Sequence, residues 1–237
     1  MKIHAGLSDN TGVTCSPTAT PIRPLLRLAA ALAFALLACG EAEPDAPRPP
    51  GPAVPVPEAT TARDVAVLQI RELGEIRIEL LADVAPLTAA HFRALAEQGA
   101  YDGTTFHRVI PGFMIQGGDP NTRDRDPRND GLGGSEPLVP DEHPAVSHVR
   151  GIVSLANRGF PNSGAMQFFI LVADARHLDG KHAVFGRVTS GMDVVDRITA
   201  SDLDLYGRHG PPNRPTQDVV IEHVRIERGQ PSPTAAR

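Results

Sequence analysis

From residue 65 to residue 227 the chain alternates short apolar runs with polar residues, glycine and proline. Residues 65–70 and 75–80 show a period of two and are separated by Leu73-Gly74, which predicts two strands joined by a tight turn. Further short runs, bounded by glycine or proline, predict more strands at residues 152–155, 168–172, 183–185 and 219–221.

Apolar residues recur at helical spacing in two other segments. Pro86 suits the first turn of a helix that buries Phe92 and Leu95, and Gly99 ends it. A second, shorter helix is predicted over residues 191–199. Many short strands with two helices favour a closed antiparallel barrel with helical caps, because closure leaves no exposed strand edge. The pattern alone also fits a β-sandwich.

Residues 106–119 combine the side chains that a binding pocket needs. The sequence is Phe-His-Arg-Val-Ile-Pro-Gly-Phe-Met-Ile-Gln-Gly-Gly-Asp. It places one cation, Arg108, near the large apolar side chains of Phe113 and Met114 and near the amide of Gln116, and this favours a pocket over a plain strand. The alternative is that the apolar residues belong to the core and that Arg108 is a solvated surface charge.

This stretch resembles, almost letter for letter, the signature of the cyclophilin-type peptidyl-prolyl cis-trans isomerases. The resemblance covers roughly residues 65–227 and continues, in the order that the family uses, through residues 151–157, 166–170 and 177–186. It implies a mainly β fold, namely a closed eight-stranded antiparallel β-barrel capped by two α-helices. It also implies an isomerase that acts on proline-containing polypeptides and needs no cofactor and no metal.

The resemblance carries over to individual positions. It implies a catalytic set of Arg108, Phe113, Gln116 and His182. It implies substrate-binding roles for Met114, Ala156, Asn157, Gln167, Phe169, His177 and Leu178. The chain departs from the family at two positions, since the frequent tryptophan is His177 and the usual serine before Gln-Phe-Phe is Met166. In relatives with the tryptophan, its broad ring is implicated in holding cyclosporin.

The chemistry of proline isomerisation fits these residue types. Rotation about an X–Pro bond faces a barrier of about 18–20 kcal/mol because amide resonance is lost. A catalyst therefore needs an apolar slot for the proline ring and a donor that stabilises the twisted amide, but no nucleophile or base. Arg108 can supply that donor as the lone pair localises on the prolyl nitrogen. A tethered binding module that keeps the slot but turns over slowly is the alternative function.

The N-terminal region has the features of a lipoprotein signal. Arg23 and Arg27 precede an apolar run at residues 28–37, and the following Ala38 and Cys39 complete a Leu-Leu-Ala-Cys sequence that looks like a bacterial lipobox. This predicts a signal peptide at residues 1–38 and lipidation of Cys39. The alternative is a plain secretory signal with an incidental cysteine. Because the segment before Arg23 is long and polar, a start nearer that residue also stays open.

The lipobox and the composition together predict the domain organisation and the location. Residues 39–61 form a proline-rich linker, residues 62–228 the isomerase domain and residues 229–237 a disordered tail. The predicted location is the cell envelope, with the domain outside the cytoplasm. An anchor in the outer membrane is favoured if the organism has one, since no aspartate follows Cys39. The protein is expected to be a monomer.

The charge argues against a nucleic-acid partner, and the cysteine content argues against a disulfide or a thiolate metal ligand in the domain. The formal net charge is −5, and no basic cluster occurs, which argues against nucleic acid. The only two cysteines, Cys15 and Cys39, precede the globular part, so the predicted domain has no disulfide and no thiolate ligand.

Other chemistries have weaker signals. The histidine pairs 177/182 and 143/148 lack a cysteine or patterned carboxylate that would complete a metal site. Ser154 and Ser163 lie in no nucleophile-elbow sequence, which argues against a hydrolase. The glycine-rich residues 131–134 lack the lysine of a phosphate-binding loop and look instead like the family loop beside the active site.

Overall fold

The structure is a computed structural model that describes residues 51–59, 61–134 and 136–229. The predicted signal peptide, Cys39 and the first part of the predicted linker lie outside the described residues, as does the tail from residue 230. All described residues belong to one compact unit.

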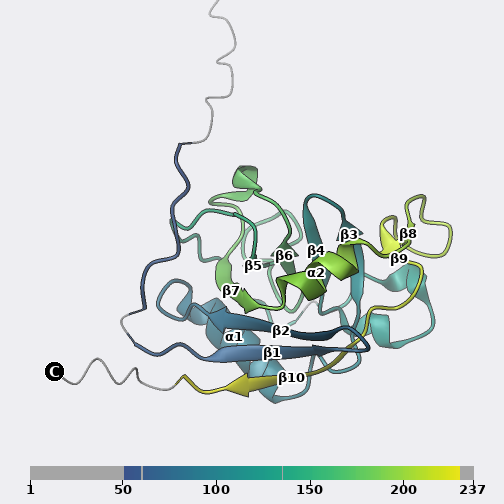
Figure 1. The fold of residues 1–237 in the computed structure, drawn as a ribbon, viewed down its shortest axis with the longest axis horizontal. Helices are drawn as coiled ribbons and strands as arrows, with labels where there is room; N and C mark the ends of the chain where they lie inside the picture. The colour runs from purple at the N-terminus through teal and green to yellow at the C-terminus, as the bar shows by residue number, and fades with distance from the viewer. Residues whose placement is uncertain (1–50, 60, 135, 230–237) are drawn as a thin grey trace, which may run out of the picture. The chain divides into compact units, whose positions relative to one another are not determined.

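An antiparallel sheet dominates this unit (Figure 1). Within the described ranges it has eight strands in the order β10-β1-β2-β7-β5-β6-β4-β3. The strands are β1 (Val65–Ile70), β2 (Gly74–Leu80), β3 (Phe106–Ile110), β4 (Met114–Gly117), β5 (Ile152–Leu155), β6 (Phe168–Leu171), β7 (Val184–Ser190) and β10 (Ile221–Glu227). A separate short ladder pairs β8 (Leu203–Asp204) with β9 (Arg214–Pro215).

The sheet is curled but open, so the prediction of a closed barrel is wrong. Its two edge strands are β10 and β3, and the segments beside them meet only at the isolated bridge Thr105–Val220 and a few backbone bonds. The outer edge of β3 has another partner, because the Val109 N–H donates to the Asn213 carbonyl at 2.8 Å. A neighbouring loop therefore covers an edge that barrel closure would otherwise have paired.

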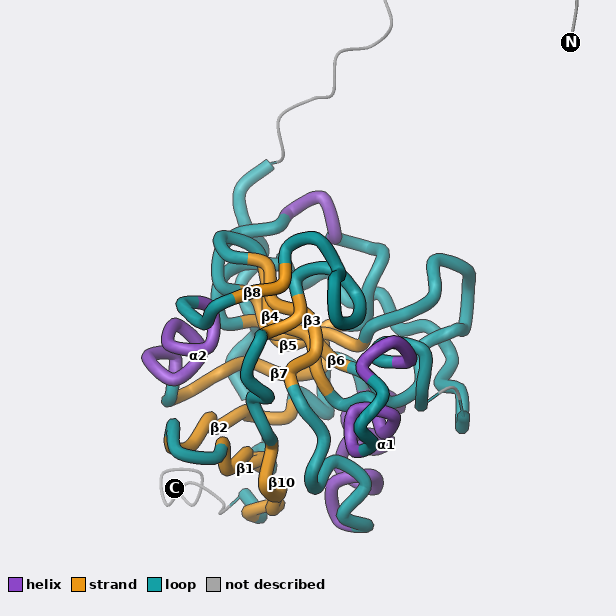
Figure 2. The backbone as a smooth tube through the Cα atoms, turned by 90° about the vertical axis from the view of Figure 1, so that its right-hand side faces the viewer, coloured by secondary structure: helices purple, strands orange, loops and turns teal. Residues whose placement is uncertain are grey.

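Two helices flank the strands in Figure 2, and buried side chains of both belong to one hydrophobic cluster. The first, α1 (Pro86–Glu97), has Pro86 in its first turn, and Gly99 follows its C-cap with φ +70°. The second, α2 (Met192–Thr199), buries Val194, Val195 and Ile198. Both helices lie where the apolar spacing predicts them. Short 3₁₀ turns also occur at η1 (Pro120–Arg123), η2 (Pro127–Asn129) and η3 (Arg176–Leu178).

The buried side chains form two clusters on opposite faces of the central strands. The larger cluster contains an aromatic group of Phe92, Tyr101, Phe106, Phe168 and Phe185. The smaller cluster contains Met114, Ile152, Phe169, Leu171 and Val184. Strand β6 contributes alternate residues to each cluster, as the two-residue period of a strand requires.

Several boundaries differ from the sequence prediction. Residues 106–119 are largely the hairpin β3–β4, so a strand pattern and a pocket pattern coincide there. The glycines that end it serve the core, because a Cβ at Gly118 would lie 3.0 Å from the Phe168 ring. Strand β7 continues well past the predicted residues 183–185. The run at 219–221 only leads into β10, because the ladder with β1 starts at Ile221.

The described part of the predicted linker contacts the domain. The Val54 N–H donates to Ser147 Oγ at 2.7 Å, and the Ser147 N–H donates to the Val54 carbonyl at 2.9 Å. Arg176 Nη1 donates to the Gly51 carbonyl at 3.1 Å, and Val56 packs against the smaller cluster. The proline-rich sequence gives no sign of these contacts. None of the helices in the described ranges has the length and apolar character that a membrane crossing needs.

Candidate active site

The site lies on one face of four neighbouring strands. The register pairs Arg108 of β3 with Gln116 of β4. It pairs Phe169 of β6 with both Gln116 and Ser154 of β5. Because directly paired residues point to the same face of a sheet, the four side chains form one row. The row passes from an exposed cation through a half-buried amide to a buried ring and a buried hydroxyl.

A β-bulge in β3 turns Arg108 toward this face. Phe106 pairs with Gly117 and Arg108 pairs with Gln116, so His107 is the extra residue on the β3 side. In a regular strand Phe106 and Arg108 would share a face. The bulge leaves Phe106 buried in the larger cluster while Arg108 is exposed beside the site.

A chain of hydrogen bonds orients Arg108. Its Nη1 donates to Gln116 Oε1 at 3.2 Å, and Gln116 Nε2 donates to Gln167 Oε1 at 2.9 Å. Gln167 Nε2 donates to the carbonyls of Gly131 at 3.1 Å and Gly133 at 2.9 Å. Since a carbonyl can only accept, these two glycines fix both amide orientations and leave Gln116 Oε1 facing the guanidinium. Desolvation lowers the pKa of Arg108, but an arginine stays charged at neutral pH.

The open side of the smaller cluster presents apolar side chains, and we call this surface the slot. Met114 and Phe169 are buried in its floor. Phe113, Ala156 and Leu178 are only partly buried and pack around them. Partly exposed apolar side chains around a buried floor are typical of a small-ligand site.

Two histidines border this slot. The His182 ring stands edge-on to Phe169, with ring centroids 5.2 Å apart and planes at 89°. Its Nδ1 lies 3.2 Å from the Leu155 carbonyl, to which it donates. Burial lowers the pKa of His182, so the ring is neutral at pH 7. The exposed His177 ring lies with its centroid 5.6 Å from that of Phe113.

Two pockets share Asn157 in their lining. One, of about 180 Å³, lies between Gln116, Gln167 and the loop at residues 131–134. The other, of about 320 Å³, lies between His182, His143 and Phe160. Asn157 lines both and donates from Nδ2 to the Lys181 carbonyl at 3.0 Å. The structure thus brings the predicted site residues together, beside two pockets that share Asn157.

The two departures from the family pattern lie in different surroundings. Met166 is 6% exposed, packs in the larger cluster and lines one wall of the smaller pocket. Its carbonyl accepts a bond from the Tyr101 hydroxyl at 3.1 Å. His177, in contrast, is exposed at the rim. The tryptophan replacement therefore alters the surface that a ligand meets, whereas the serine replacement mainly alters packing.

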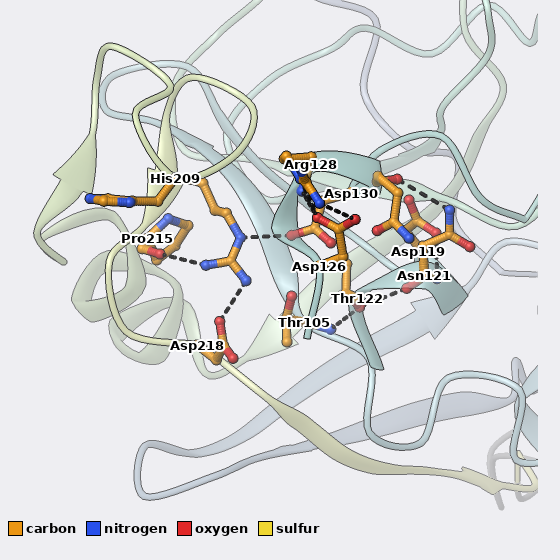
Figure 3. A network of polar contacts seen from close by, with 12 residues as sticks. Thr105, Asp119, Asn121, Thr122, Asp126, Arg128, Asp130, His209, Pro215 and Asp218 are labelled. Atoms are coloured by element: carbon orange, nitrogen blue, oxygen red, sulfur yellow. Dashed lines mark hydrogen bonds and ion pairs between the residues drawn. The ribbon is translucent and has the colours of Figure 1, made fainter. Parts of the chain in front are cut away.

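Buried carboxylates support the loop that carries Gly131 and Gly133 (Figure 3). Asp119 is fully buried and accepts from the Asn121 N–H at 2.8 Å and the Gly133 N–H at 3.1 Å. Asp130 accepts from Arg214 Nε at 2.6 Å. Residues 123–125 of the intervening segment are exposed, in contrast to these two carboxylates.

The sequence did not single out a second polar group beside the slot. His148 is 1% exposed, and its ring lies between Ser154 Oγ and the Asp179 carboxylate, each 3.0 Å from a ring nitrogen. From the sequence, Ser154 is a candidate only for a nucleophile and His148 only for a metal ligand. In the described part of the chain, no three His, Cys, Asp or Glu side chains are grouped so that they could hold a metal ion.

Comparison with known proteins agrees with this geometry. The sequence model of the family described as cyclophilin type peptidyl-prolyl cis-trans isomerase/CLD matches residues 65–226. The chain is 41% identical over 172 residues to peptidyl-prolyl cis-trans isomerase-like 1 of Neurospora crassa, covering 70% of this chain and 96% of that protein. It is 39% identical over 160 residues to a peptidyl-prolyl cis-trans isomerase of Acinetobacter baylyi, covering 65% and 81%.

A solved structure gives the same result. The fold matches the crystal structure of a Cryptosporidium parvum cyclophilin type peptidyl-prolyl cis-trans isomerase with a TM-score of 0.61 and 28% identity, over 70% of this chain and 98% of that one. The chain belongs to the cyclophilin-type peptidyl-prolyl cis-trans isomerases. It is accordingly an isomerase of X–Pro bonds, and its substrates are proline-containing peptides.

Proposed function

We propose that Arg108 catalyses isomerisation by stabilising the twisted prolyl amide. The observation that carries this proposal is the hydrogen-bond chain from the loop carbonyls to Gln116 Oε1, which holds the guanidinium beside an apolar slot. When the amide twists, its nitrogen regains a lone pair that can accept from Arg108. That acceptor is weak in the planar amide, so the donor stabilises the transition state more than the ground state.

The other predicted site residues hold the substrate in this proposal. Phe113, Met114, Phe169 and Leu178 surround the proline ring, and His182 borders its edge. Gln116, Gln167, Asn157 and the backbone at Ala156 bind the peptide on either side, with His177 at the rim. The support for this arrangement is the smaller pocket, because Gln116, Gln167, Ala156 and Asn157 all line it.

An isomerisation assay with the purified protein and a short X–Pro peptide tests the activity. Uncatalysed exchange takes tens to hundreds of seconds at 25 °C, which leaves a wide window for acceleration. We expect a rate that rises linearly with enzyme concentration. Binding of the peptide without any acceleration would instead identify a holdase that uses the same slot.

We also propose that the isomerase is a lipid-anchored protein of the cell envelope that acts on secreted or envelope proteins as they fold. The support is the apolar run at residues 28–37 with two preceding arginines and the Leu-Leu-Ala-Cys sequence that ends at Cys39. In this proposal residues 1–38 are removed and the Cys39 thiol is lipidated. The domain then lies outside the cytoplasm, facing the periplasm if the anchor is in an outer membrane, and acts as a monomer.

Fractionation of cells that express the full chain tests the anchor. The wild type should sediment with membranes, and Cys39→Ser, with its signal otherwise intact, should not be lipidated. Mass spectrometry of the processed N-terminus should show a diacylglyceryl adduct only in the wild type. Full recovery of the wild type in the soluble envelope fraction would refute the anchor without bearing on isomerase activity. Light scattering of the delipidated protein tests the monomer.

A further inference from the structure

His148 joins the interior of the sheet to the rim of the site. Its Nε2 lies 3.0 Å from Ser154 Oγ, and its Nδ1 lies 3.0 Å from Asp179 Oδ1. The Asp179 Oδ1 atom also accepts from the His148 backbone N–H at 2.7 Å. Ser154 belongs to β5 and is fully buried, whereas Asp179 directly follows η3. A single side chain therefore spans from a core strand to a surface turn.

The hydrogen-bonding roles of these groups follow from burial. The His148 ring is almost fully buried, and burial lowers its pKa although the Asp179 carboxylate opposes the shift. The neutral ring has one N–H and one acceptor nitrogen. A carboxylate can only accept, so Nδ1–H donates to Asp179, and Nε2 accepts from the Ser154 hydroxyl. All three groups are thereby satisfied in one arrangement, which fixes the position of Asp179.

Asp179 in turn fixes η3. Its Oδ2 accepts from Arg176 Nε at 2.6 Å, and Arg176 donates to the carbonyls of Gly51 and Pro52 in the predicted linker. The turn presents its other two residues, His177 and Leu178, to the slot, where they pack beside Phe113 and the floor. The placement of these rim residues thus depends on the Asp179 carboxylate. His148 binds it from the interior and Arg176 binds it within the turn, and Arg176 also connects it to the linker.

The same three side chains have the connectivity of a Ser-His-Asp catalytic triad, but their surroundings exclude that use. Ser154 is 0% exposed and pairs across the sheet with Phe169, whose ring is itself buried. A nucleophile must approach a substrate carbonyl to within about 3–3.5 Å, and a fully buried hydroxyl in mid-strand has no such access.

We propose that His148 is a positioning residue of the isomerase: by linking Ser154 to Asp179 it holds η3 so that Leu178 and His177 complete the slot. The inference rests on the proposed substrate-binding role of those two residues. It goes beyond the proposed function because His148 contacts no substrate and acts through Asp179. Loss of the link should loosen one wall of the slot, which both planar and twisted amides touch, while Arg108 stays in place. Substrate binding should suffer, and turnover should not.

The test compares kcat and KM of the full chain with those of His148→Leu, which fills similar space but offers no hydrogen bond. We expect KM for an X–Pro peptide to rise about tenfold with kcat within about twofold of wild type. His148→Gln should restore KM to within about threefold, because an amide supplies one donor and one acceptor. Val224→Ala, in β10 of the larger cluster, serves as a control of reduced stability and should leave KM unchanged.

A double-mutant cycle guards against misfolding of the His148 variant. Asp179→Ala reaches the same link from the surface, since its side chain is 30% exposed. It should raise KM by a similar factor, and the double variant should be no worse than the larger single effect.

Any of three results would overturn the proposal. The first is that the KM increases of the two single variants multiply in the double variant. The others are an unchanged KM in Asp179→Ala and a KM increase in Val224→Ala as large as in His148→Leu. Failure of the proposed function would appear elsewhere, as a kcat that does not depend on Arg108.

Discussion

The two faces of strand β6 have the same chemistry but different uses. Phe168 faces the larger cluster, where its ring meets Phe92, Tyr101 and Phe106 edge-on at centroid distances of 5.4 to 6.1 Å. Phe169 faces the smaller cluster, which combines buried residues such as Met114 with partly buried ones, and its ring and that of His182 meet edge to face. Neighbouring phenylalanines therefore belong to a closed core and to an open slot, and only the strand's alternation separates them.

The comparison shows that the open face keeps its shape through polar groups. Helix α1 covers the larger cluster, and its aromatic rings pack on one another. Among the described residues, neither α-helix contributes to the smaller cluster that underlies the slot. Its walls are held instead by the amide chain of Gln116 and Gln167 on one side and by the His148–Asp179 link on the other. Substitutions on the closed face should change stability, whereas those on the open face should change activity.

The largest effect is expected from Phe168→Ala. Removing a fully buried aromatic ring costs about 3–5 kcal/mol through lost transfer free energy and the cavity that remains. Phe169→Ala is the matched control, because it removes the same ring one residue away. It should lose less stability, since its cluster is already open, but raise KM more. Denaturant unfolding with parallel kinetics measures both, and equal losses of stability would show that the two faces do not differ in this way.

Arg108→Ala should be the clearest activity variant. Loss of one preorganised donor typically costs about 2.7–4 kcal/mol, or roughly 10²–10³ in rate. The melting temperature should change little, because Arg108 is exposed and supports no core packing.

Arg108→Lys is the control for charge alone. Lysine keeps the cation but cannot hold two contacts with a planar fork, so it should recover only part of the rate. An unchanged kcat/KM in Arg108→Ala, with an unchanged melting temperature, would remove Arg108 from the mechanism.

The sequence predicted much of this site, because most of the signature residues lie on strands β3 and β4. The two-residue period separates Phe168 from Phe169, and the resemblance places Arg108, Gln116 and His182 in one site. The bulge at His107 could not be predicted, because no local sequence pattern shows that a strand will contain an extra residue without a partner on the neighbouring strand. The link from His148 to Asp179 joins residues 31 positions apart and appears only when the turn is folded. The open sheet could not be predicted either, because the edge of β3 is bonded by the distant loop at Asn213.

The next prediction concerns stability in acid and depends on His107, the extra residue of the β3 bulge. His107 is 2% exposed, and in the described residues neither of its ring nitrogens has a hydrogen-bond partner. Burial lowers its pKa from 6.5 to about 4. Below pH 6.5 the unfolded chain binds a proton there that the folded protein does not. Stability is therefore complete above about pH 6.5 and is lost as the pH falls toward 4, by about 3 kcal/mol in all.

The measurement is the free energy of unfolding between pH 7 and pH 4 for the wild type and for His107→Gln. Other histidines with lowered pKa values, including His91, contribute to both curves, so the difference between the curves isolates His107. The variant should show the shallower loss. Parallel curves would mean that His107 is not kept neutral by folding.

The smallest expected effect is at the rim, where His177 replaces the tryptophan that is frequent in the family. The family resemblance implies that this tryptophan helps to hold cyclosporin, and the His177 ring already lies 5.6 Å from that of Phe113. An imidazole offers less apolar area than an indole, so we expect weak cyclosporin inhibition of an otherwise active isomerase. His177→Trp should tighten inhibition by roughly 1–2 kcal/mol, the size of an aromatic contact. Its kcat/KM for a short peptide should barely change, because the floor of the slot is untouched. The measurement is a cyclosporin inhibition curve for the wild type and for His177→Trp. Equal inhibition constants would show that residue 177 does not govern the affinity for the drug, which is then set deeper in the slot.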